Sequence, residues 1–147
     1  MAWTPLPIGV ENFEDLMTHG YYYVDKTPFI RELLDMKGKV NLFTRPRRFG
    51  KTLNMSMLRY FLDCEYPETE KIFSGTKILE DGEEYRKYMG NYPVISVTLK
   101  SMKQATYEEA FYCLKEEIAR EYRRHDKILD SLDQEEEREK FRRFAAW

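Results

Sequence analysis

A basic stretch at residues 45–52 carries the residue types that phosphate binding requires, and it reads Arg-Pro-Arg-Arg-Phe-Gly-Lys-Thr. The stem of Lys51 is long enough to bring its ammonium group to the outer phosphates of a nucleotide, and the hydroxyl of Thr52 can ligate Mg²⁺. The backbone amides of Phe49, Gly50 and Lys51 would cradle the phosphates if a helix begins here. These residues favour the binding of a phosphate-bearing ligand together with Mg²⁺.

The stretch departs from the P-loop, or Walker A, pattern at one position. That pattern has a glycine five residues before Gly50, where this sequence has Arg45. We therefore expect a variant loop. The guanidinium groups of Arg45, Arg47 and Arg48 suit phosphate oxygens, which makes all three candidate phosphate ligands. An equally weighted alternative is that they form salt bridges with the acidic segment 63–91 or with another domain.

The segments around the stretch predict an α/β fold. Residues 40–44 have the character of a strand, and residues 51–63 carry apolar side chains at helical spacing. A buried strand is predicted over 93–99, which is dense in β-branched residues. A long amphipathic helix is predicted over 106–124, with Thr106 as its N-cap. These elements predict a partial P-loop NTPase core.

The N-terminal part of the sequence predicts two helices before this core. The first follows a cap at Asn12. The second is expected to have Thr27 as its N-cap and Pro28 at its first position, and to end near Gly38. Short helical pieces are expected within 64–91.

We expect three parts in the chain. Residues 1–39 form a helical segment packed on the core, residues 40–125 form the partial P-loop NTPase domain, and residues 126–147 form a charged helix or tail.

Composition and charge narrow the class of protein. The chain has 147 residues, of which 42% are hydrophobic, enough to build one core. It has no apolar run of membrane-spanning length and no signal peptide, so we expect a cytoplasmic protein without a membrane partner. The net charge is only −2, but residues 36–62 contain seven basic residues and no acidic one. Positive charge is concentrated around the candidate phosphate-binding loop.

Two motifs together resemble a known family. The stretch at 45–52, preceded by Tyr-Val-Asp-Lys-Thr at 23–27 and by Pro-Ile-Gly at 7–9, is similar to the N-terminal domain of the AAA-ATPase-like proteins of bacteria. The resemblance covers about residues 5–125. In that family an arginine at the position of Arg45 is usual, and a C-terminal PD-(D/E)XK nuclease-like domain is common.

The resemblance implies a P-loop NTPase of the additional-strand type that uses ATP and Mg²⁺. It also implies a later strand that ends in acidic residues, which hold Mg²⁺ and activate water. No such motif follows Leu99, so we expect a fragment truncated before it, also lacking the nuclease-like domain of the same polypeptide. Hydrolysis by these residues alone is then expected to be weak or absent, with catalytic residues unassigned.

Several alternatives remain at this point. The basic segment could instead bind nucleic acid and no nucleotide, either in this chain or as part of a longer protein. A third alternative is that the loop binds no ligand and has only a structural role. ATP and GTP are not distinguished. Asp25 and Lys26 could lie near the nucleotide, or Asp25 could form an Asx turn before a helix. Phe49 and the tyrosines at 21–23 could stack on a base, although aromatic residues in this setting more often belong to a core.

Overall fold

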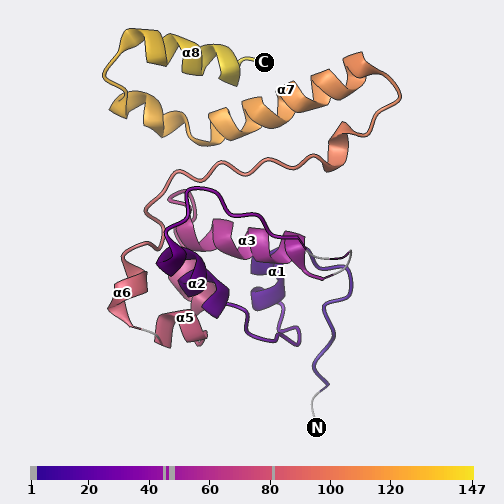
Figure 1. Cartoon of the computed structure of the whole chain (residues 1–147), viewed down its shortest axis with the longest axis vertical. Coiled ribbons are helices and arrows are strands. Elements are labelled where there is room, and N and C mark those ends of the chain that lie inside the picture. Colours follow the sequence, from indigo (N-terminus) through magenta and orange to yellow (C-terminus); the bar gives the residue numbers. More distant parts are fainter. Residues whose placement is uncertain (1–2, 45, 47–48, 81) are drawn as a thin grey trace. The chain divides into compact units, whose positions relative to one another are not determined.

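The computed structural model describes residues 3–44, 46, 49–80 and 82–147, and Figure 1 shows helices joined by irregular segments. Contacts along the chain divide it into two compact units, Met1–Val94 and Ile95–Trp147, here named the N-terminal unit and the C-terminal unit.

The helices of the N-terminal unit are α1 (Phe13–Thr18), α2 (Pro28–Met36), α3 (Lys51–Leu62), α4 (Thr69–Phe73), α5 (Lys77–Glu80) and α6 (Glu83–Arg86). The cap predicted at Asn12 is confirmed, because its Oδ1 accepts a hydrogen bond of 3.1 Å from the amide of Asp15. The helix predicted over 51–63 is confirmed as α3, and the short helical pieces predicted within 64–91 are α4, α5 and α6.

Aromatic rings hold α1, α3 and α4 together. The side chains of Phe13, Phe61 and Phe73 are fully buried. The ring of Phe73 lies 5.0 Å from that of Phe13 and 5.2 Å from that of Phe61, measured between centroids. Such pairs add to the free energy gained from burying the rings themselves. This core fixes the direction of α3, whose first turn carries the candidate phosphate-binding residues.

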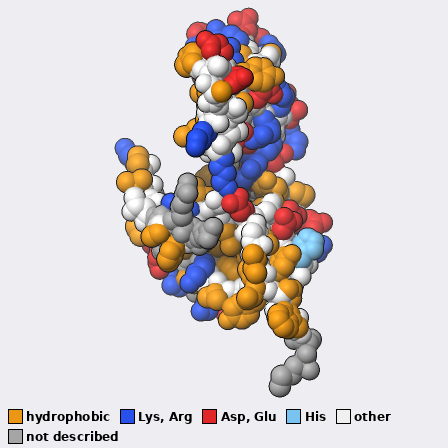
Figure 2. Space-filling model, turned by 90° about the vertical axis from the view of Figure 1, so that its right-hand side faces the viewer, with side chains coloured by type: hydrophobic (Ala, Val, Ile, Leu, Met, Phe, Trp, Pro, Cys, Tyr) orange, Lys and Arg blue, Asp and Glu red, His pale blue; other side chains and the backbone are white. Residues whose placement is uncertain are grey.

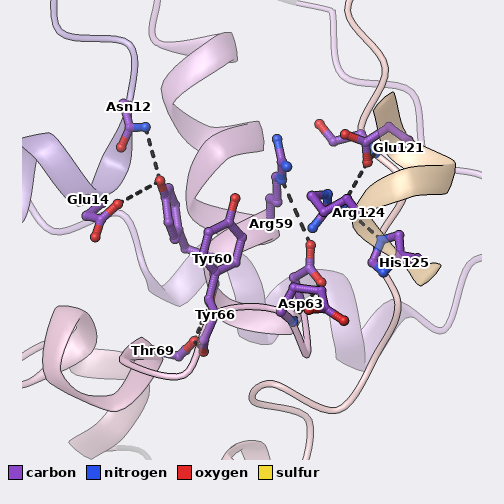
Figure 3. A network of polar contacts seen from close by, with 12 residues as sticks. Asn12, Glu14, Arg59, Tyr60, Asp63, Tyr66, Thr69, Glu121, Arg124 and His125 are labelled. Carbon is purple, nitrogen blue, oxygen red and sulfur yellow. Dashed lines mark hydrogen bonds and ion pairs between the residues drawn. The ribbon is translucent and has the colours of Figure 1, made fainter. Parts of the chain in front are cut away.

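A polar network also joins α1 to α3 (Figure 3). The hydroxyl of Tyr60 donates to Oε2 of Glu14 at 2.9 Å and accepts from the side-chain amide of Asn12 at 3.1 Å. Burial, partly opposed by the hydrogen bond from Asn12 and reinforced by Glu14, raises the pKa of Tyr60 from 10.0 to about 12. The neutral hydroxyl is therefore the form that the folded chain favours.

Stability is expected to fall as pH rises from 10 to about 12. The pKa of Tyr23 is also raised to about 12, mainly by burial, so the folded chain keeps two protons that the unfolded chain releases near pH 10. The resulting stabilisation is complete below pH 10 and is lost as pH rises through about 12. Thermal unfolding across this range should show a shallower decline for Tyr60→Phe than for Tyr112→Phe, whose tyrosine is exposed. Equal declines in the two variants would contradict this account.

The C-terminal unit contains the 3₁₀ helices η1 (Lys100–Met102) and η2 (Asp126–Ser131) and the helices α7 (Tyr107–Arg124) and α8 (Glu135–Ala145). The cap predicted at Thr106 is confirmed by a hydrogen bond of 3.2 Å from the amide of Glu109 to its hydroxyl oxygen. The ring of Tyr122 packs against those of Phe141 and Phe144, with centroids 4.8 and 5.2 Å apart. These contacts hold the charged helix α8 against α7.

The predicted α/β fold is wrong, because neither predicted strand forms. Within the described residues no strand is present, and one isolated parallel bridge joins Asp63 to Tyr92. Residues 40–44 are irregular, with Val40 and Leu42 more than four-fifths exposed.

Residues 93–99 are also irregular. The amides of Ser96 and Thr98 are hydrogen-bonded to the carboxylates of Glu121 and Glu117 on α7, at 3.0 and 3.3 Å, instead of to a neighbouring strand. The β-branched residues of this segment favour an extended backbone, but a sheet forms only where a second strand pairs with the first. The partial P-loop core with an α/β architecture is therefore replaced by a helical arrangement.

Hydrophobic side chains gather on part of the surface of the N-terminal unit (orange in Figure 2), and Trp3, Leu6 and Ile8 are among the exposed ones. None of the helices in the described part of the chain combines the length and the apolar character that crossing a bilayer would need.

Candidate functional site

The loop at 49–50 leads directly into α3. Gly50 precedes the helix with φ of 70° and ψ of 19°, a left-handed conformation that glycine adopts without steric cost. Its carbonyl accepts the first helical hydrogen bond, from the amide of Asn54 at 2.9 Å. The amides of Lys51, Thr52 and Leu53 lie in the first turn, where a helix supplies no acceptor of its own. The helix dipole adds partial positive charge at this end, which favours an anion.

A cavity of about 510 Å³ lies beside this helix end. Phe49 and Gly50 form part of its lining, and α3 contributes Leu53, Asn54 and Met57. Residues 22–26, the first turns of α2, Pro7 and two residues of α1, Phe13 and Leu16, complete the wall. The structure therefore brings together the two motifs that are separate in the sequence, since Tyr23-Val24-Asp25-Lys26 and Phe49-Gly50 line one cavity.

A smaller cavity of about 230 Å³ adjoins the larger one, because Phe29 and Asn54 line both. Lys51 lines this smaller cavity. Lys51 and Thr52 are both exposed at the start of α3. The basic and hydroxyl groups predicted to contact phosphate and Mg²⁺ thus lie at the helix end, within reach of solvent.

The wall formed by residues 22–26 is fixed by hydrogen bonds to a distant part of the unit. Oδ2 of Asp25 accepts from the amide of Lys77 at 2.8 Å, and the hydroxyl oxygen of Thr27 accepts from the amide of Ile78 at 3.1 Å. These are the first two amides of α5, which would otherwise lack acceptors. The hydroxyl of Tyr23 accepts from the amide of Lys26 at 2.9 Å and contacts Sδ of Met57 on α3 at 3.7 Å. The wall is therefore anchored to α3 and α5.

The same contacts explain Asp25. Its Oδ1 accepts from the amide of Thr27 at 2.8 Å, which is the Asx turn considered above. Partial burial alone would raise the pKa of Asp25, but hydrogen bonds from the amides of Lys77 and Thr27 and from the hydroxyl of Thr27 outweigh it and hold the pKa below its usual value. The carboxylate is ionised at neutral pH with both oxygens engaged, so its role here is to hold backbone.

The remaining predicted residues are placed as follows. Arg45, Arg47 and Arg48 lie outside the described residues. Phe49 is 62% exposed, so it is not part of the core. The predicted cap at Thr27 differs from the structure, because its hydroxyl serves α5 and makes no capping bond to α2, although Pro28 does occupy the first turn of α2.

Sequence reasoning missed two polar residues in the lining of the larger cavity, Glu32 and Asn54. Glu32 lies four positions after Pro28, and Asn54 lies four positions after Gly50. Each is therefore one helical turn beyond a residue that the sequence analysis named. The helical repeat was the available signal.

A family model identifies the family of the chain. The family described as "Predicted AAA-ATPase" (AAA-ATPase_like) matches residues 7–147. An uncharacterised protein in the vnfD 5′ region of Azotobacter chroococcum mcd 1 is 31% identical over 99 residues, which cover 67% of this chain and 17% of that protein. The chain therefore spans a small part of the length of this relative. No solved structure matches.

Proposed function

Because the chain belongs to the AAA-ATPase-like family, we propose that it binds ATP with Mg²⁺ at the first turn of α3. In this proposal the amides of Phe49, Gly50 and Lys51 cradle the phosphates, and the ammonium group of Lys51 reaches the β- and γ-phosphates. The hydroxyl of Thr52 ligates Mg²⁺. That ion usually keeps water and phosphate oxygens as its other ligands, so one exposed protein hydroxyl suits it.

The observation that carries the proposal is the position of Gly50. This residue is the N-cap of α3 and also lines the cavity of about 510 Å³, so the helix end that favours an anion opens onto a space for the rest of a ligand. The positive φ of Gly50 also supports phosphate binding at this position, because a glycine there lets the backbone approach a phosphate closely.

Turnover of ATP by these residues alone is expected to be slow. The sequence after Leu99 lacks the strand ending in acidic residues that would supply a base, and Asp25, a carboxylate in the cavity lining, already accepts two backbone amides. A water-activating base needs an available acceptor near the terminal phosphate. We propose that the chain acts as part of a larger ATPase, which is consistent with the greater length of its relative.

Calorimetric titration with ATP, with and without Mg²⁺, tests the proposal. We expect saturable binding that is stronger with Mg²⁺. The competing function is nucleic-acid binding by the basic stretch, which would be independent of Mg²⁺ and would weaken steeply as salt rises. Binding of a DNA oligonucleotide with this salt dependence, in the absence of any ATP binding, would contradict nucleotide binding and favour the alternative.

The role of Thr52 gives a specific prediction. Thr52→Val keeps the shape of the side chain and removes the hydroxyl, so ATP binding in Mg²⁺ should weaken by about tenfold or more, as for loss of a metal-holding group. In EDTA the variant and the wild-type chain should bind ATP equally. Thr18→Val, in an exposed threonine at the end of α1, is the matched control. If Mg²⁺ strengthens the binding of ATP to the Thr52→Val chain as much as to the wild-type chain, Thr52 is not a ligand of Mg²⁺.

A further inference from the structure

The segment before η1 is held along one edge by α7. The amides of Ser96 and Thr98 donate to the carboxylates of Glu121 and Glu117, whose side chains are almost fully buried. The two carboxylates are one helical turn apart, about 6 Å along the axis, and amides two residues apart on an extended chain are separated by about 6.7 Å. This match holds the segment in an extended form (the trace between α6 and α7 in Figure 1).

Neighbouring arginines balance the charge of these carboxylates. Arg120 pairs with Glu117, and Nη2 of Arg124 lies 2.7 Å from Oε2 of Glu121. A buried carboxylate needs such partners, because burial removes the water that would otherwise solvate its charge. Along this edge α7 therefore takes the place of a neighbouring strand, and the edge is closed to further pairing.

The opposite edge of the segment is open. Successive residues of an extended chain direct their amides and carbonyls to alternate sides, so those of Ile95 and Val97 point away from the edge that α7 covers. Within the described part of the chain, neither residue makes a backbone hydrogen bond. The side chains of Ile95, Val97 and Leu99 are 68%, 45% and 69% exposed. An apolar edge with unpaired backbone groups favours association with another strand.

We propose that this edge pairs with the same edge of a second copy of the chain, in an antiparallel arrangement centred on Val97. The order Ile-Ser-Val-Thr-Leu at 95–99 alternates apolar and hydroxyl residues and is symmetric in kind about Val97. In this register Val97 lies opposite the partner's Val97, and Ile95 lies opposite the partner's Leu99. The two Val97 residues then exchange two backbone hydrogen bonds, and the apolar side chains form cross-strand pairs.

The arrangement closes at two copies, which favours a second copy of this chain as the partner. Each segment has one open edge, since α7 covers the other, so pairing leaves no edge for a third chain. A two-fold contact also requires an edge that fits itself, and the symmetric order of side chains meets this requirement. No like charges come together, because Lys100 lies opposite the partner's Val94.

A charge at position 97 tests this pairing, because the two copies of that side chain meet. Sedimentation equilibrium from low micromolar to submillimolar concentration should show dimers of the wild-type chain. Val97→Lys and Val97→Glu should each weaken dimerisation by about a hundredfold or more, since like charges then lie opposite each other. An equimolar mixture of the two variants should restore the dimer. Val40→Lys, at another exposed valine, should leave dimerisation unchanged.

Hydrogen exchange of the backbone amides gives a second readout. The amides of Ile95 and Val97 should exchange more slowly as the concentration of the wild-type chain rises, whereas the exchange of Ser96 and Thr98 should not depend on it. Far-UV circular dichroism checks that the variants are folded. A wild-type chain that stays monomeric, or a dimer that Val97→Lys leaves intact, would overturn the proposal. A mixture of the two charged variants that stays monomeric would overturn the register centred on Val97.

Discussion

Replacing Lys51 with alanine is expected to weaken the binding of Mg²⁺-ATP by about a hundredfold. The variant loses an ammonium group that would donate hydrogen bonds to two phosphates, and bonds to charged groups contribute about 1.5–3 kcal/mol each, where 1.4 kcal/mol is a tenfold change. Lys51 is exposed at the start of α3, so the fold should be unaffected. Calorimetry measures the affinity, and thermal unfolding checks that the variant remains folded.

Lys39→Ala is the matched control for this experiment. Lys39 is an exposed lysine of the same basic segment, and its loss changes the net charge equally. If Lys39→Ala weakens ATP binding as much as Lys51→Ala does, the effect comes from the general positive charge of the segment and the specific role of Lys51 is wrong.

The second large effect concerns stability. Asp25→Ala is expected to lower the free energy of unfolding by about 2 kcal/mol, because the amides of Lys77 and Thr27 lose a charged acceptor. Asp25→Asn should lose about half as much, since its side chain has a single acceptor oxygen. Denaturant unfolding measures the change. Asp15→Ala, at an exposed aspartate in the first turn of α1, should change stability by only a few tenths of a kcal/mol.

The sign of the pH dependence provides a check on the same contacts. The pKa of Asp25 in the folded chain lies below the ordinary value of 3.8, so its stabilisation is present above pH 3.8 and is lost as pH falls through the folded pKa. The acid-induced loss of stability should therefore be smaller in Asp25→Asn than in the wild-type chain. Identical acid unfolding curves would contradict the role assigned to this carboxylate.

The parts of the fold that sequence predicted correctly depend on neighbouring residues. The caps at Asn12 and Thr106 bind amides three positions along the chain, and the helices that follow them are set by the spacing of nearby apolar residues. The wrong predictions depend on distant partners. Thr27 was expected to cap its own helix and instead binds the amide of Ile78, which is 51 residues away.

The two predicted strands failed for a related reason. β-Branched residues favour an extended backbone, but a sheet also needs a second chain segment to accept its hydrogen bonds. In 93–99 the amides of Ser96 and Thr98 bond to carboxylates of α7. Nothing in the local sequence specifies that competition.

The candidate site divides in the same way. The sequence could predict Phe49, Gly50, Lys51 and Thr52 as candidates because phosphate binding uses consecutive residues at a helix start, and their role stays a prediction. The cavity could not be predicted, because its walls come from α1, α2, α3 and the segments around Pro7 and residues 22–26, which only folding brings together. Asp25 shows the limit most clearly, since its Asx turn is local but its bond to Lys77 spans 52 residues.

The most direct test of nucleotide binding at α3 is an NMR titration of the chain with Mg²⁺-ATP that follows the backbone amide signals. We predict the largest chemical-shift changes at residues 50–53, which comprise the N-cap and the first residues of α3, and further changes along residues 22–26. Amide signals at 50–53 that stay in place at saturating ATP, whether or not signals elsewhere move, would contradict the proposed site.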